Sequence, residues 1–74
     1  MKIYIVGKGV VYDHSMNEGV HQVEDYAYKQ ADELMAVGEW SDAQHFDQDN
    51  HKVMSWFRED GEEYVFVEEW ELSY

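Results

Sequence analysis

Large apolar side chains recur at every second position near both ends of this chain, and this spacing restricts its fold more than any other feature. The closing run EEYVFVEEWELSY places Tyr64 and Phe66 two residues apart and Trp70 four residues further along the same side, with Glu68 as the exception to the alternation. Residues 2–12 alternate in the same way around Ile3 and Ile5. Residues two apart share one face of a strand, so both segments are predicted to be β-strands. Gly7 and Gly9 within the first strand indicate a bulge or a close backbone approach.

A helical period replaces this alternation in the middle of the chain. Ser15 and Glu18 have the spacing of a capping box, and Asn17 is an alternative cap. Gly38 suits the position just after a helix. These signals predict one helix over about residues 16–37, with an apolar stripe formed by Val20, Val23, Ala27, Ala31 and Leu34.

Strand patterns return after the helix at 51–58 and 63–72, joined through the turn-forming pair Asp60-Gly61. A further short strand at 42–46 is predicted to pair with 51–58 through the DQDN turn. The order is then β-α-β-β(-β) within one domain, residues 1–74. We predict an α+β two-layer sandwich with the helix on a three- to four-stranded, mostly antiparallel sheet.

The two faces of the last strand differ in composition. We expect its aromatic side, with Tyr64, Phe66 and Trp70, to meet the helix. The other side then faces outward with an apolar centre. That open face is either an ordinary solvated surface or a homodimer interface, and we place the interface around Val65, Val67, Met54 and Trp56.

The charge balance limits the classes of partner. Seventeen Asp and Glu residues face five Lys and Arg, for a formal net charge of −12. Direct binding to nucleic acid or to an anionic membrane is disfavoured, and a basic protein partner is favoured. The chain has no Cys, and no apolar run reaches the length of a membrane span. The N-terminus lacks the pattern of a signal peptide, so we expect a cytoplasmic protein.

Catalytic motifs are absent from the sequence. The GKG at 7–9 lacks the spacing of a phosphate-binding loop, and no serine lies in a G-x-S-x-G context. Carboxylates are so abundant that no pair stands out as an acid and base. The aromatics lack the basic groove that base-stacking proteins have. We predict a non-enzymatic protein without catalytic residues, cofactor or metal.

One segment leaves a metal site as an alternative. The run HFDQDNH places His45, Asp47, Asp49 and His51 at two-residue spacing, which would put four ligand-type side chains on one face of an extended strand. It lacks the Gly and Glu positions of an EF-hand loop. The same residues suit a polar hairpin turn, and we prefer that interpretation.

A row of carboxylates runs along the predicted helix, opposite its apolar stripe. Its members recur every seven residues, and Lys29 is the cation nearest to it. Their spacing of roughly 10.5 Å is much wider than the one charge per about 1.7 Å of double-stranded DNA. The row is therefore either a solvated helix face or part of a denser nucleic-acid mimic. The predicted partner-binding residues are the row and two aromatic anchors: Glu18, Asp25, Asp32, Glu39, Trp40 and Tyr28.

The tail adds a second group of carboxylates, Glu62, Glu63, Glu68, Glu69 and Glu71. With this tail and the acidic row, the whole chain resembles in general character the small acidic inhibitors of phages and mobile elements. Anti-CRISPR and anti-restriction proteins, some of them DNA mimics, are among these. The resemblance implies a stoichiometric inhibitor of a nuclease or of a CRISPR-type surveillance complex, with no catalysis. It assigns no individual residue a role.

Overall fold

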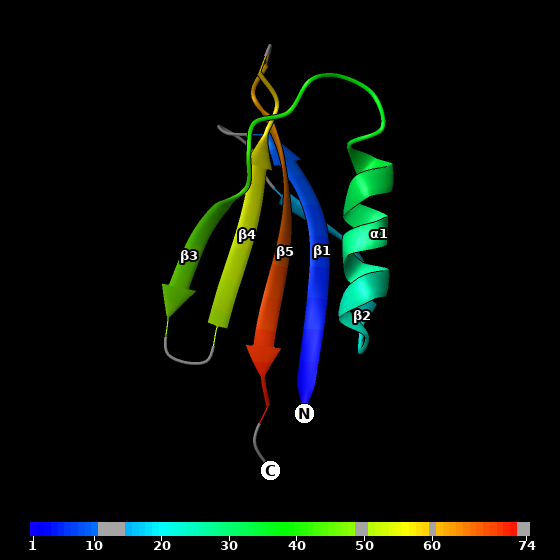
Figure 1. The fold of residues 1–74 in the computed structure, drawn as a ribbon, viewed down its shortest axis with the longest axis vertical. Coiled ribbons are helices and arrows are strands. Elements are labelled where there is room, and N and C mark those ends of the chain that lie inside the picture. The colour runs from blue at the N-terminus through cyan, green and yellow to red at the C-terminus, as the bar shows by residue number, and fades with distance from the viewer. Residues whose placement is uncertain (11–14, 49–50, 60, 73–74) are drawn as a thin grey trace.

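The computed structural model describes residues 1–10, 15–48, 51–59 and 61–72. One helix packs on one face of a five-stranded antiparallel sheet of order β2-β1-β5-β4-β3 (Figure 1). The small two-layer α+β architecture is confirmed, with five strands where three to four were predicted. None of the helical structure in these residues is long and apolar enough to cross a membrane. The elements are β1 (Lys2–Val10), β2 (Ser15–His21), α1 (Glu24–Leu34), β3 (Gln44–Gln48), β4 (His51–Phe57) and β5 (Glu63–Glu71).

The additional strand is β2, and it occupies the segment where the sequence predicted the start of the helix. The helix begins at Glu24 and ends at Leu34, so it is half the predicted length. Its N-cap is Val23, which makes no side-chain capping bond. Residues 15–21 instead pair with the edge of β1, with a bulge opposite Val6 and Gly7. Pairing satisfies the backbone groups of both strands, and this outweighs a local capping signal in a segment that contains a glycine.

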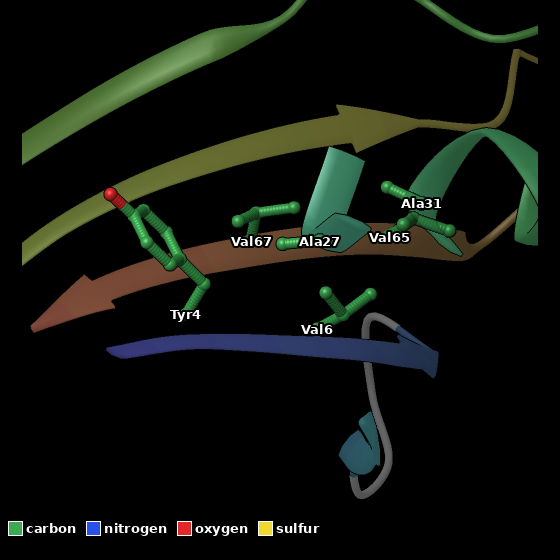
Figure 2. Close-up of a cluster of buried hydrophobic side chains, with 6 residues drawn as sticks. All are labelled: Tyr4, Val6, Ala27, Ala31, Val65 and Val67. Atoms are coloured by element: carbon green, nitrogen blue, oxygen red, sulfur yellow. The ribbon is translucent and has the colours of Figure 1, made fainter. Parts of the chain in front are cut away.

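Small residues on the helix let it lie close to the sheet. Ala27 and Ala31, one turn apart, are both fully buried. They lie over valines of β1 and β5, as Figure 2 shows. The predicted stripe is thus correct for these two alanines, and Leu34 also packs against the core. Val20 and Val23 do not belong to it, because they are 62% and 47% exposed. The buried core consists of Tyr4, Val6, Ala27, Ala31, Val65 and Val67.

The prediction for the faces of β5 is wrong. Val65 and Val67 point toward α1 and are almost completely buried. The aromatic side of β5 lies on the opposite face of the sheet, where Tyr64 and Phe66 are the cross-strand partners of Gly9 and Gly7. The two alanines of the helix leave room for valine at this close approach, whereas the aromatic rings lie across glycines that have no side chain.

The hairpin after the helix follows the prediction with shifted boundaries. β3 runs from Gln44 to Gln48 instead of 42–46, and it pairs with β4. β4 and β5 each end one residue earlier than the predicted 51–58 and 63–72. β1 spans Lys2–Val10, and positions 11 and 12 of the predicted 2–12 lie outside the described residues. Gly38 has a positive φ of 97°, four residues after the helix ends. Asp60 of the predicted Asp60-Gly61 turn lies outside the described residues.

Candidate functional site

Exposed carboxylates gather on and beside α1. Four are on the helix itself, in its first and last turns, and Glu18 of β2 lines a shallow hollow with Glu33 and Lys29. Glu18 therefore lies beside Glu33, although it is on a strand and not on the helix, while Asp25 and Asp32, seven residues apart, share one line along the helix. We call this surface the acidic helix side: Glu18, Glu24, Asp25, Asp32 and Glu33, all exposed.

The acids at the two ends of α1 have opposite effects on its stability. Glu24 and Asp25 in the first turn interact favourably with the helix dipole. Asp32 and Glu33 lie near the C-terminal end, where the dipole is negative, and the last turn holds no basic residue. Each costs about 0.3–1 kcal/mol there at low ionic strength. Two carboxylates thus stand where they oppose the stability of their own helix.

The other predicted partner-binding residues lie apart from this surface or are partly buried. Glu39 is exposed in the connection after the helix, where its carbonyl accepts from the Glu59 backbone N–H. Trp40 is half-buried against the core, and its Nε1–H donates to the Val37 carbonyl at 3.1 Å. Tyr28 is also half-buried and meets the Trp56 ring edge-on at 6.0 Å. Both predicted anchors are therefore only partly exposed.

Burial and nearby carboxylates raise the pKa of two tyrosines, Tyr4 of β1 and Tyr28 of α1. Burial raises the pKa of Tyr4, and Glu69 and Glu24 raise it further because they repel a phenolate. Tyr4 also hydrogen-bonds the Glu69 side chain, which favours its protonated form. Burial and the same two glutamates raise the pKa of Tyr28. This end of the molecule therefore disfavours additional negative charge.

The raised pKa of Tyr4 predicts a loss of stability in alkaline solution. The folded chain retains the Tyr4 proton after the unfolded chain has lost it near the ordinary tyrosine value of 10.0. The free energy of unfolding should therefore fall as the pH rises above that value toward the folded-state pKa. Tyr4→Phe should make this fall shallower in urea unfolding between about pH 9 and 11. Tyr26→Phe, at a 62% exposed position, is the matched control. An equally steep fall in the Tyr4→Phe chain would contradict the assignment.

The opposite face of the sheet carries a layer of apolar side chains that α1 does not cover. The ring of Phe66 occupies the place of a side chain at Gly7, and the Tyr64 ring does the same at Gly9. The Tyr64 ring centre lies 6.0 Å from that of Phe57 and 6.1 Å from that of Phe66. Phe66 is only 7% exposed, but most of the others are half-buried or exposed. We call this surface the apolar sheet face: Ile3, Ile5, Val20, Phe46, Val53, Phe57, Tyr64, Phe66 and Trp70.

One carboxylate lies on the apolar sheet face within the described parts of β1, β3, β4 and β5, and it has a partner. Glu68 Oε2 lies 2.7 Å from Nε2 of His51 on the neighbouring strand. The His51 ring stacks on Trp70 with 3.8 Å between ring centres and 14° between the planes. The imidazole is thus held from the side by the carboxylate and from one face by the indole. This pairing lets the face carry an acid without leaving it unpaired.

The structure separates the residues of the metal hypothesis. His45 and Asp47 of β3 line a shallow hollow on the helix side of the sheet, together with Lys52. His51 lies on the apolar sheet face, because it pairs with Gln48 and Trp70 in the ladder. Asp49 is outside the described residues. Within the described residues, no group of three or more His, Asp or Glu side chains is arranged to hold a metal ion.

Sequence reasoning missed the contact between the glycines of β1 and the aromatics of β5. A signal for it was present: Gly7 and Gly9 have the same two-residue spacing as Tyr64 and Phe66. An antiparallel pairing that aligns the two patterns places each ring over a glycine. This pairing then fixes which face of the sheet carries the aromatic side of β5. Proximity of His51 to Glu68 had no comparable local signal, because the two residues lie 17 positions apart.

Comparisons with protein-family models, with curated proteins and with solved structures find no match for this chain.

Proposed function

We propose that this protein is a non-enzymatic binding protein that inhibits a nucleic-acid-binding partner by occupying its basic surface with the acidic helix side. The observation that carries the proposal is the placement of Asp32 and Glu33. They lie in the last turn of α1, where carboxylates oppose helix stability and which itself holds no basic residue. A basic groove would remove this repulsion on binding, so acids that weaken the free protein strengthen the complex.

The distribution of charge supports the same interpretation. A protein of net charge −12 attracts a basic surface at long range, and this attraction raises the association rate. The carboxylates of the acidic helix side come from two elements, and Glu18 of β2 and Glu33 of α1 line one hollow, so the surface is broader than the single helix row that the sequence predicted. A patch can match the two phosphate rows of a duplex better than one line. The partner class we propose is a nuclease or a CRISPR-type surveillance complex.

A variant that removes four acids of the acidic helix side tests this proposal. We expect Glu18→Gln, Asp25→Asn, Asp32→Asn and Glu33→Gln together to weaken partner binding about 10-fold or more at about 50 mM salt, and to flatten its salt dependence. The partner is first captured from lysate at about 50 and 300 mM salt with a DNA competitor, then purified for titration. DNA should displace the protein from it.

The matched control removes the same charge elsewhere. Asp47, Glu59, Glu62 and Glu71 are all exposed, and none belongs to the acidic helix side. Changing each to its amide leaves both four-residue variants at the same net charge, −12 + 4 = −8. If the two variants bind equally well, net charge alone drives the association and the acidic helix side has no special role. Retention of wild-type affinity by the first variant would reject the proposal.

A further inference from the structure

We propose that the apolar sheet face binds a second copy of this chain, forming a back-to-back sandwich with both acidic helix sides pointing outward. This inference concerns the face opposite the proposed partner site and does not depend on the partner. It replaces the interface expected around Val65, Val67, Met54 and Trp56. In the structure the two valines are buried under the helix, and Trp56 packs against the same core.

The size of the face fits a dimer. Five strands spaced about 4.8 Å apart and some seven residues long give roughly 600 Å² of flat area. Protruding side chains make the accessible area larger, so it is comparable to the about 800 Å² per partner of a standard interface. The whole chain exposes 5266 Å². A compact monomer of its mass is expected to expose about 4,800 Å². The chain thus exposes more surface than a compact monomer of its mass, as expected for a subunit whose apolar sheet face is uncovered.

The chemistry of the face fits a copy of itself better than a charged partner. Lys2, Lys8 and Lys52 alternate onto the helix side of the sheet. The carboxylate of Glu68 already has His51 as a hydrogen-bond partner on its own chain. A two-fold interface needs a surface that complements itself, and an apolar layer with its one acid partnered in place does so. Burying the pair together avoids the penalty of an isolated buried carboxylate.

The segregation of charge also favours this arrangement over other self-associations. Two chains of net charge −12 repel each other, and the repulsion is strongest where the carboxylates approach. A back-to-back dimer places two sheets, about 10 Å apart, between the two acidic helix sides. That separation exceeds the Debye length of about 8 Å at physiological salt. Of the two broad faces, the apolar sheet face is therefore the one that can meet its copy at least electrostatic cost.

The test is the mass of the protein in solution, with a charge placed in the middle of the face. We expect wild-type protein at about 100 µM to sediment with about twice the 8.8 kDa mass of one chain. Ile5→Lys should raise the dissociation constant of the dimer at least about 100-fold. Ile5 is directly opposite Glu68 on the neighbouring strand, so the new ammonium gains a cross-strand partner and the monomer should fold. Circular dichroism checks this.

Two further variants control the experiment. Val37→Lys adds the same charge at a 77% exposed position in the loop after the helix, and it should dimerise as the wild type does. Phe46→Lys, at a 52% exposed position on β3, replaces Ile5→Lys if that chain does not fold. The salt dependence provides an independent readout. Raising salt from about 0.05 to 0.5 M should tighten the dimer, because screening reduces the repulsion between like charges.

Several results would overturn the proposal. A wild-type chain that stays monomeric at this concentration in high salt has no self-association on this face, and another occupant must then be sought. A dimer that survives Ile5→Lys uses a different surface, such as pairing between the β3 edges. Dissociation with added salt would mean that charges, not apolar side chains, hold the two copies together. Since the proposed partner complex should weaken with salt, the two associations are distinguishable.

Discussion

Replacing Gly7 by alanine is expected to destabilise the protein by about 2–4 kcal/mol. The new Cβ would meet the ring of Phe66, with Cε1 at 2.6 Å, and the backbone carbonyl oxygen of Met16 at 2.8 Å. Phe66 is 7% exposed, so its ring has little room to move away. The Met16 carbonyl belongs to β2 and cannot shift without disturbing the β1–β2 pairing. The measurement is urea unfolding followed by tryptophan fluorescence.

Gly61→Ala is the control for this experiment. A Cβ at that exposed position has its nearest neighbour, Arg58 Cδ, at an ordinary 3.9 Å. Gly61→Ala should change the free energy of unfolding by no more than about 0.5 kcal/mol. In a double-mutant cycle, Phe66→Ala should remove much of the cost of alanine at position 7, because the two side chains would compete for the same space. Additive effects would mean that the ring does not lie over Gly7.

Val67→Asp is expected to prevent folding. Val67 is 2% exposed and belongs to the core on which α1 packs. A carboxylate there would be buried without a partner, which costs several kcal/mol. A domain of this length has a total stability of about 4–11 kcal/mol, so most of it would be lost. The nearby carboxylates of Glu24 and Glu69, which already raise the pKa of Tyr4, would repel the new charge.

Far-ultraviolet circular dichroism and the dispersion of amide resonances measure this outcome. Val37→Asp makes the same chemical change at a 77% exposed position, and it should leave the fold intact. A Val67→Asp chain that still unfolds cooperatively would contradict the assignment of this side of β5 to the core. The comparison matters because the alternation of β5 permits either side to meet the helix.

The periodicities of the sequence predicted the elements of this fold better than their packing. Two-residue alternation correctly indicated β1, β4 and β5, because one apolar side chain per two residues is what a strand with a buried face requires. Ala27 and Ala31 were correctly placed on the buried side of the helix. The prediction failed at 15–21, where capping-box spacing suggested a helix and the structure has β2. That strand exists because β1 offers an unpaired edge, which local sequence does not show.

The candidate site was predicted in part. The charge imbalance indicated an acidic surface, and Asp25 and Asp32 are indeed exposed on one side of the helix. Glu18 belongs to a different element and lies beside Glu33, since β2 lies next to α1. The partial burial of Trp40 and Tyr28 was not predicted, because the sequence does not show which way the backbone directs an aromatic side chain that lies next to charged residues. Their burial depends on Trp56 and the core, which lie far along the chain.

The sequence by itself determined the net charge, the alternating strands and the apolar side of a helix, because each depends on residue type and on spacing along the chain. Only the tertiary structure decided which side of β5 is buried. The choice rests on a fit between distant residues: valines beneath Ala27 and Ala31, and aromatic rings across Gly7 and Gly9. The same fit left an apolar layer on one face and the carboxylates of α1 on the other. Since both alternations of β5 are partly apolar, packing volume and not hydrophobicity settled the arrangement.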